Sequence, residues 1–370
     1  MSNFLPQKNQ LKTLQIVRAL ASTSVVYFHI GSVPCFGGIG SLPCFGGFGV
    51  DIFFVLSGFV MAMIIATGQS ASRFAISRVS RIVPLYWVLT TFVLVLAAFK
   101  PELLNSTTAN LVNYLRSILF VPYFKENGTL MPMLFVGWSL NYEMVFYVCV
   151  ALSLIISPKR SIFVTAGLLV ATYMSFGYFA HSLVLNRFFG NELMYEFILG
   201  MLAFEVYNKG YFAHVPTGVV LAAGIAGYLF MAVADSNAFH INRLLSYGVP
   251  SFIVISSAVR LENAINSAPH VLVNLFIGAG DASYATYLSH PYVTEAVRKI
   301  LVLKLHLFDI NSPLGVAITV SITLMTGALI YRLIDKPLSQ RCKALIEKLL
   351  VQLRNRLALF RYRTAAVLTQ

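Results

Sequence analysis

The chain has 370 residues, of which 58% are hydrophobic and only 11% are charged. Soluble domains carry about 25% charged residues, so this composition excludes an ordinary soluble enzyme. The composition predicts an all-α integral membrane protein, and the lipid bilayer is therefore an expected partner. The net charge of +13 does not indicate nucleic acid as a partner, because the basic residues gather in short loops and in the tail, where membrane topology places them.

About ten apolar runs follow one another along the chain, each near the length that crosses a bilayer. They cover residues 11–30, 49–67, 84–99, 134–156, 162–180, 192–207, 216–234, 244–259, 271–292 and 314–334. We therefore expect about ten transmembrane helices in a single bundle over residues 1–340. The longest stretch between runs, residues 100–133, is too short to be an attached soluble catalytic domain, so any catalysis must occur inside the bundle.

Basic side chains predict the orientation of these helices. The segment between the second and third runs holds Arg73, Arg78 and Arg81 but no acidic residue. Residues 341–370 form a basic tail, which we expect to be an amphipathic helix on the inner leaflet or a solvated helix that anchors the last span. The positive-inside rule places both segments and both termini in the cytoplasm, although the basic stretch 298–304 would then face outward.

Arg18 and His29 lie eleven residues apart in the first apolar run. At about 3.6 residues per turn, both side chains share one face of a helix and lie about 16 Å apart along its axis. Such side chains inside a membrane usually face a bundle interior or a water-filled cavity, which suggests chemistry or transport through the bilayer. The alternative is an arginine that snorkels to the interface and a structural histidine, and the pair alone does not decide between them.

A tandem repeat of nine residues follows the first run, at residues 32–40 and 41–49. Its Cys35 and Cys44 could pair if that face of the membrane is oxidising, and the sequence leaves this open. The four cysteines of the chain show no metal-ligand spacing, so no metal is expected.

Five segments, in this order and at these spacings, resemble the bacterial membrane acyltransferase family 3. They are an arginine and a histidine separated by ten residues (Arg18 and His29), GVDIFFVLSGF at 49–59, RVSRIVPLY at 78–86, WSLNYE at 138–143 and SYATYLSHP at 283–291. Each segment is a weak signal alone. The resemblance extends from Leu14 to about Pro337 and thus covers nearly the whole chain.

The resemblance implies an O-acyltransferase in the inner membrane of a bacterium, with acetyl-CoA or another acyl-CoA as its donor. The acyl group would pass from the cytoplasm to a hydroxyl of an exopolysaccharide, O-antigen or lipid-linked saccharide at the outer face. Polysaccharide-assembly proteins are further partners consistent with this function. The sequence names neither the sugar nor the acyl length. A proton-coupled transporter with the same buried charges is the alternative, although the two halves of the chain show no repeated span pattern.

The resemblance also assigns candidate site residues. Acyl transfer to a hydroxyl needs a base that titrates near neutral pH, which suits His29, whether as a general base or through an acyl-histidine intermediate. Arg18 would hold a phosphate or carbonyl of the donor, or set the charge on His29. The distance between the two, about 16 Å, is comparable to a pantetheine arm. An acyl-CoA could therefore thread its thioester from the cytoplasm up to His29.

Three arginines are candidates for binding the phosphates of CoA. Arg78 and Arg81 lie three positions apart and share a helix face at the cytoplasmic boundary. Guanidinium groups bind phosphate with two hydrogen bonds, and Arg73 could join them. The alternative is that all three are ordinary cytoplasmic residues placed by the positive-inside rule.

Two carboxylates and a second histidine complete the candidate set. Glu143 lies inside an apolar run and needs a partner, for which Arg18 and His29 are the candidates. Asp51 is expected either to cap its helix or to orient His29. His290 is expected to be structural or to support the site from behind.

Overall fold

The computed structural model describes residues 11–30, 45–104, 107–238, 242–267 and 270–368, and this part of the chain is helical without strands. The all-α fold class is therefore confirmed. Several helices expose apolar faces that the protein itself does not cover. The helix Thr217–Ser236 is only 22% buried, and its Leu221, Ile225 and Leu229 are exposed. Such faces need lipid around them, because contact with water would be unfavourable.

Six helices of the described residues are long and apolar enough to cross a membrane: Gly49–Ala66, Ala71–Phe99, Phe135–Ile156, Pro158–Tyr178, Thr217–Ser236 and Pro313–Leu353. Leu244–Arg260 and Val271–Asp281 are shorter apolar helices. The expectation of about ten spans in a single bundle is not confirmed. The run at 271–292 shows one reason, because the chain there forms two helices that part at Ala282, instead of a single span.

The α-helices follow in the order α1 (Lys12–Ile30), α3 (Gly49–Ala66), α4 (Ala71–Phe99), α5 (Leu111–Ile118), α6 (Trp138–Ile156), α7 (Ser161–Tyr178), α8 (Leu183–Phe189), α9 (Leu193–Asn208), α10 (Thr217–Val233), α11 (Val249–Arg260), α12 (Glu262–Asn266), α13 (His270–Asp281), α14 (Ser283–Val297), α15 (Pro313–Ile330) and α16 (Lys336–Leu368). Short 3₁₀ or π segments join them: η1 (Pro101–Leu103), η2 (Phe135–Gly137), η3 (Pro158–Arg160), η4 (Ala234–Ala238), η5 (Leu244–Gly248), η6 (Arg298–Lys304) and η7 (Tyr331–Asp335). Cys35 and Cys44 of the tandem repeat lie outside the described residues, so their pairing stays open.

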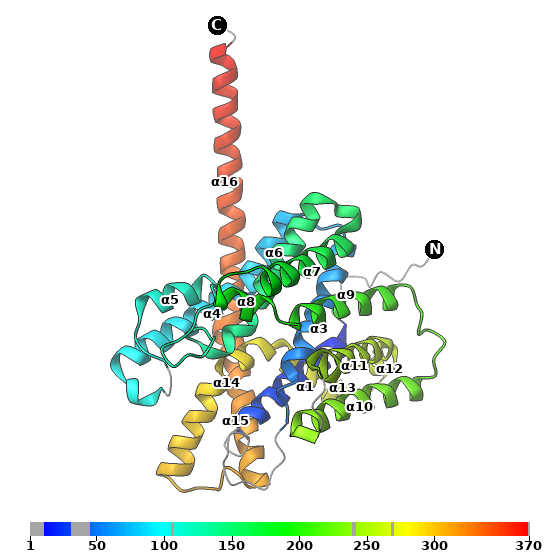
Figure 1. Cartoon of the computed structure of the whole chain (residues 1–370), viewed down its shortest axis with the longest axis vertical. Helices are drawn as coiled ribbons and strands as arrows, with labels where there is room; N and C mark the ends of the chain where they lie inside the picture. The colour runs from blue at the N-terminus through cyan, green and yellow to red at the C-terminus, as the bar shows by residue number, and fades with distance from the viewer. Residues whose placement is uncertain (1–10, 31–44, 105–106, 239–241, 268–269, 369–370) are drawn as a thin grey trace.

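The α3 helix lies inside the bundle, where it packs against α1, α6, α9 and α11 (Figure 1). Its contact with α9 depends on two glycines that let the helix backbones touch. A Cβ atom on Gly58 would lie 2.1 Å from the carbonyl oxygen of Phe197, and one on Gly200 would lie 1.9 Å from that of Val55. Both distances are far shorter than a van der Waals contact, so glycine alone fits at these positions without a shift of the backbone.

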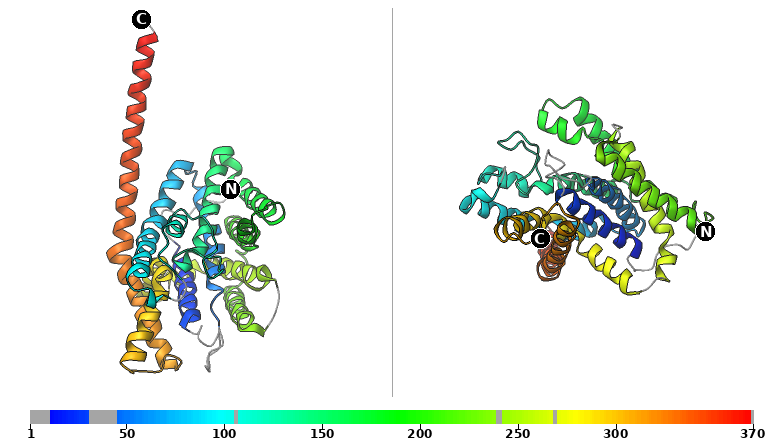
Figure 2. Two further views of the ribbon diagram at one scale, coloured as in Figure 1. Left: turned by 60° about the vertical axis from the view of Figure 1, so that its left-hand side comes forward. Right: turned by 90° about the horizontal axis from the view of Figure 1, so that it is seen from below.

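The α16 helix is rich in Lys and Arg and extends out of the bundle. Figures 1 and 2 show it running on from the α15 side and ending well beyond the other helices. Of the tail expected at residues 341–370, the described residues up to Leu368 belong to this helix, which begins at Lys336. Leu345, Leu349 and Leu353 on it are exposed. Its placement on the inner leaflet stays a prediction.

We predict that Gly200→Ala lowers the apparent unfolding temperature of the detergent-solubilised protein. The added methyl group must push α3 and α9 apart, which costs about 1–3 kcal/mol in a well-packed core. Gly167→Ala in α7 is the matched control, because a Cβ atom there meets nothing within 4 Å. Equal unfolding temperatures for the two variants would contradict the close approach of α3 and α9.

Candidate active site

The α1 and α14 helices bring the first and last sequence motifs together. Nε of Arg18 donates a hydrogen bond to Oγ of Ser283 at 3.2 Å. Farther along both helices, Nδ1 of His29 lies 3.1 Å from Nε2 of His290. From the first contact to the second, the residue numbers rise on both helices, from 18 to 29 on α1 and from 283 to 290 on α14. The two helices therefore lie side by side and run in the same direction. This pair of helices therefore carries an arginine site toward one end and a histidine site toward the other.

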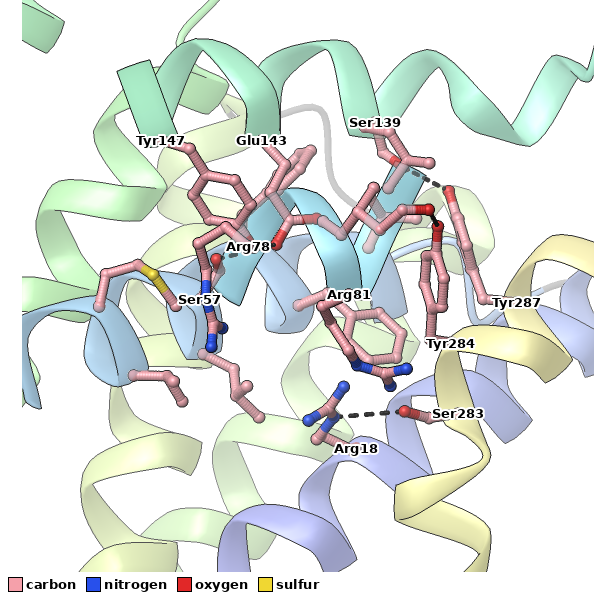
Figure 3. A pocket seen from close by; sticks show the side chains of 18 residues that line it. Arg18, Ser57, Arg78, Arg81, Ser139, Glu143, Tyr147, Ser283, Tyr284 and Tyr287 are labelled. Atoms are coloured by element: carbon pink, nitrogen blue, oxygen red, sulfur yellow. Dashed lines mark hydrogen bonds between the residues drawn. The ribbon is translucent and has the colours of Figure 1, made fainter. Parts of the chain in front are cut away.

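A cavity of about 130 Å³ lies at the arginine site. Its lining takes side chains from each of the five motif segments, and Figure 3 shows them pointing toward one another: Arg18 of α1, Ser57 of α3, Arg78 and Arg81 of α4, Ser139, Glu143 and Tyr147 of α6, and Ser283, Tyr284 and Tyr287 of α14. Of the seven predicted site residues, the structure places four here, namely Arg18, Arg78, Arg81 and Glu143. The other three, His29, Asp51 and Arg73, are not among the described residues that line it.

Glu143 is the carboxylate of this cavity, and two hydroxyl groups hold it. Ser57 donates to its Oε1 at 3.2 Å, and the Tyr147 hydroxyl donates a short hydrogen bond to the same oxygen. The expected partners were Arg18 or His29. Arg18 shares the cavity with Glu143 but forms no ion pair with it at hydrogen-bond distance within the described residues. Sequence reasoning missed the two hydroxyl partners, because neither serine nor tyrosine stands out in an apolar run.

Arg81 has a buried carboxylate of its own. Its Nη1 lies 2.6 Å from Oδ2 of Asp335, which is only 1% exposed. The guanidinium also lies over the ring of Tyr284, 5.1 Å from the centroid. Asp335 was not predicted as a site residue, although an acidic residue at the end of the last apolar run, opposite a basic cluster, was a usable signal. The pair neutralises much of the charge that Arg81 brings to the cavity.

The three arginines of α4 have different surroundings. Arg78 lines the cavity, and its Nε donates to Oγ of the adjacent Ser77 at 3.2 Å. In the described part of the chain, no carboxylate lies within ion-pair distance of Arg78. Arg73 is exposed in the first turn of α4 and does not reach the cavity lining. The predicted group of three therefore divides into a paired arginine, a cavity arginine available to an anion, and a surface arginine.

The two histidines sit just beyond the cavity. His290 is fully buried, and its Nδ1 lies 2.7 Å from the carbonyl oxygen of Tyr287. The Tyr287 side chain lines the cavity, and its hydroxyl bonds to Ser139 at 2.8 Å. Three residues of helix rise about 4.5 Å, so Tyr287 separates the histidines from the cavity by roughly one turn. His29 is not among the described residues that line this cavity, so threading of a donor from Arg18 up to His29 stays a prediction.

Asp51 is paired with an arginine that the sequence analysis did not consider. It is fully buried and receives two hydrogen bonds from Arg243, from Nε to Oδ1 and from Nη2 to Oδ2, each 2.9 Å long. In the part of the chain that the structure describes, the hydrogen bonds of the Asp51 carboxylate are these two from Arg243, so its roles in capping its helix or orienting His29 stay predictions. Arg243 was not predicted, because it lies more than 190 residues away, outside every motif. The ion pair joins buried Asp51 of α3 to Arg243, whose side chain is 40% exposed and which directly precedes η5.

The site offers two kinds of chemistry. The cavity presents guanidinium groups that suit a phosphate or another anion. The histidine pair can accept a proton close to one wall of that cavity. Among the described residues, no group of three or more His, Cys, Asp or Glu side chains is placed to hold a metal ion.

Comparison with known proteins agrees with this convergence of motifs. A family model described as an acyltransferase domain matches residues 11–332. The exopolysaccharide production protein ExoZ of Rhizobium meliloti is 30% identical over 304 residues, which cover 80% of this chain and 90% of that protein. The peptidoglycan O-acetyltransferase OatA of Listeria monocytogenes is 31% identical over 184 residues, which cover 44% of this chain but 28% of OatA. No solved structure matches the chain.

Proposed function

The chain belongs to the membrane acyltransferase family 3, and from this premise we propose that it is an O-acetyltransferase of cell-surface glycans. The donor is acetyl-CoA, and the acceptor is a hydroxyl of an exopolysaccharide or lipid-linked saccharide. The observation that carries the proposal is the single cavity onto which the motif segments converge beside a pair of histidines. The likeness to ExoZ and OatA, whose names refer to exopolysaccharide and to peptidoglycan O-acetylation, supports this acceptor class.

The charges of the cavity suit one end of an acyl-CoA. Three guanidinium groups line it against the one carboxylate of Glu143, and Arg81 is already paired with Asp335. Arg18 and Arg78 are thus the arginines that an anionic donor would meet. A cavity of about 130 Å³ is smaller than the roughly 300–1,000 Å³ of sites that enclose a drug-sized ligand. It would therefore hold a phosphate or the acyl thioester, while the rest of the donor stays outside.

His29 is the base of the proposed reaction. The acceptor hydroxyl loses its proton to the imidazole as its oxygen attacks the thioester carbonyl. The C–S bond then breaks, and the CoA thiolate takes the proton back from the imidazolium, so the cycle needs no net proton. Arg18 lies about 16 Å from His29 along α1, so its proposed role is to hold a phosphate of the donor in the cavity. An acyl-histidine intermediate would use the same groups in two steps.

The membrane arrangement completes the proposal. We place about ten spans in the bacterial inner membrane with both termini in the cytoplasm, following the basic segments of the chain. The arginine cavity then faces the cytoplasm, where acetyl-CoA is found, and the histidine pair lies toward the outer face, where the glycan arrives. Proteins of polysaccharide assembly would deliver that glycan.

We predict that His29→Ala abolishes acceptor-dependent release of CoA from acetyl-CoA by the protein in liposomes, with crude surface glycan as acceptor. Loss of a general base lowers kcat by about 10²–10⁴-fold. His181→Ala is the matched control, because His181 is exposed in a loop, and it keeps wild-type activity. Equal CoA release by wild type and His29→Ala would remove His29 from the mechanism. Proton flux without CoA release would favour a transporter.

We further predict that Arg78→Ala raises KM for acetyl-CoA and leaves KM for the acceptor unchanged. A hydrogen bond to a charged group is worth about 1.5–3 kcal/mol, so the expected rise is about 10–150-fold. Arg73→Ala is the control on the same helix, since Arg73 is exposed and outside the cavity lining. If both variants change KM equally, general surface charge, and not the cavity, binds the donor.

A further inference from the structure

The hydrogen bonds around the two histidines define which ring nitrogens carry protons. A carbonyl oxygen can only accept, so Nδ1 of His290 must donate to the Tyr287 carbonyl at 2.7 Å. For the same reason, Nδ1 of His29 must donate to the carbonyl of Val25, 2.9 Å away. In neutral His290 the lone pair is then on Nε2, and this atom lies 3.1 Å from Nδ1 of His29. The single Nδ1–H of His29 therefore faces two acceptors, the Val25 carbonyl and this lone pair, and is shared between them. The assignment follows from the partners of each ring.

Because Nδ1 of each ring already carries a proton, an added proton must go to one of the two Nε2 atoms. If His290 were protonated at Nε2, that N–H would face the N–H of His29 at 3.1 Å, and two donors repel each other. His290 therefore stays a neutral acceptor. The proton enters at Nε2 of His29, the ring nitrogen on the far side from His290. The imidazolium of His29 then keeps an acceptor at Nδ1 while it carries the charge.

In the described part of the chain, neither predicted carboxylate is bonded to His29 in the way that serine hydrolases bond theirs. Serine hydrolases use a buried aspartate to orient the catalytic histidine and to stabilise its charged form. The two candidates for that task here have other partners, because Glu143 is bonded to Ser57 and Tyr147, and Asp51 is bonded to Arg243. His290 lies where such a carboxylate would lie.

We propose that His290 is a positioning residue for the acyl-transfer reaction. It fixes the ring of His29 so that the lone pair of Nε2 is presented to the acceptor hydroxyl, and it accepts from Nδ1 as the positive charge develops. The Tyr287 carbonyl in turn fixes His290, and Tyr287 lines the donor cavity. The proton-accepting group is thereby held at a constant place relative to the donor. This inference rests on the proposed role of His29 as the base.

Two amide substitutions at His290 separate its two hydrogen bonds. In His290→Gln the side-chain amide reaches the place of Nε2, so its oxygen can accept from His29. In His290→Asn the amide reaches only the place of Nδ1, so the contact with the Tyr287 carbonyl survives and the contact with His29 is lost. Both variants remove the same ring and place a neutral amide in the same buried site, so their effects on folding are matched.

The test measures kcat and KM for acetyl-CoA and acceptor in liposomes, with unfolding temperatures for each variant. We expect kcat of His290→Asn to fall at least about tenfold, out of the roughly 10²–10⁴-fold that a general base contributes, with both KM values unchanged. His290→Gln should keep kcat within about threefold of wild type, because its acceptor remains. Ser289→Ala is a control on α14, since among the described residues the hydroxyl of Ser289 bonds within its own helix, to the Ala285 carbonyl.

Several outcomes would overturn the inference. Wild-type kcat in His290→Asn would show that His29 needs no acceptor at this place. Equal losses in the Gln and Asn variants would show that the ring itself, and not its lone pair, matters. The proposed function is tested separately by His29→Ala in the same assay. If that variant is inactive while His290→Asn is fully active, the base stands and the positioning role fails, whereas activity in His29→Ala removes the base itself.

Discussion

Two contacts at different heights join α1 to α14, one between Arg18 and Ser283 and one between His29 and His290. These two contacts fix the position of α1 along α14, because sliding one helix along the other would break both of them. The α1 helix also packs against α3 and α13, and α14 also packs against α4 and α15. The α3, α4 and α6 helices supply the rest of the cavity at the arginine end. The proposed chemistry depends on this register, since it sets where the base stands relative to the donor.

The cost of burying charge explains much of the surrounding structure. A guanidinium or carboxylate inside an apolar bundle needs partners, because its hydration is lost. Asp335 meets that need for Arg81, and Arg243 meets it for Asp51. Arg78 has no such carboxylate among the described residues, so it is the arginine best able to receive an anion from outside. The distribution of partners thus distinguishes structural charges from those that remain for a ligand.

The sequence predicted which segments meet but not how their side chains pair. The family resemblance gave Arg18 and Glu143 as catalytic candidates and Arg78 and Arg81 as candidates for binding the phosphates of CoA. The structure puts all four in one cavity lining. Asp335 and Arg243 were missed as partners, because pairing across 192 or 254 residues leaves no trace in local periodicity. Asp51 was assigned to the site because it belongs to one of the motifs. Its motif neighbours line the cavity, but its own side chain does not.

The count of spans was harder to predict than the fold class. Composition alone indicates helices in a membrane, but hydropathy does not reveal where a run divides. The break at Ala282 turns one expected span into α13 and α14. That break matters for the site, because it starts α14 at Ser283, the residue that receives the hydrogen bond of Arg18.

The central claim is that donor and acceptor reach the α1–α14 pair from opposite sides of the membrane. The most direct test reconstitutes the protein in sealed liposomes with acetyl-CoA outside and measures acetylation of a glycan that is either enclosed or outside. The account predicts transfer only to the enclosed glycan, whatever the mixture of protein orientations. Permeabilising the liposomes should restore transfer to the outer glycan. Equal transfer to both glycans in intact liposomes would contradict the account.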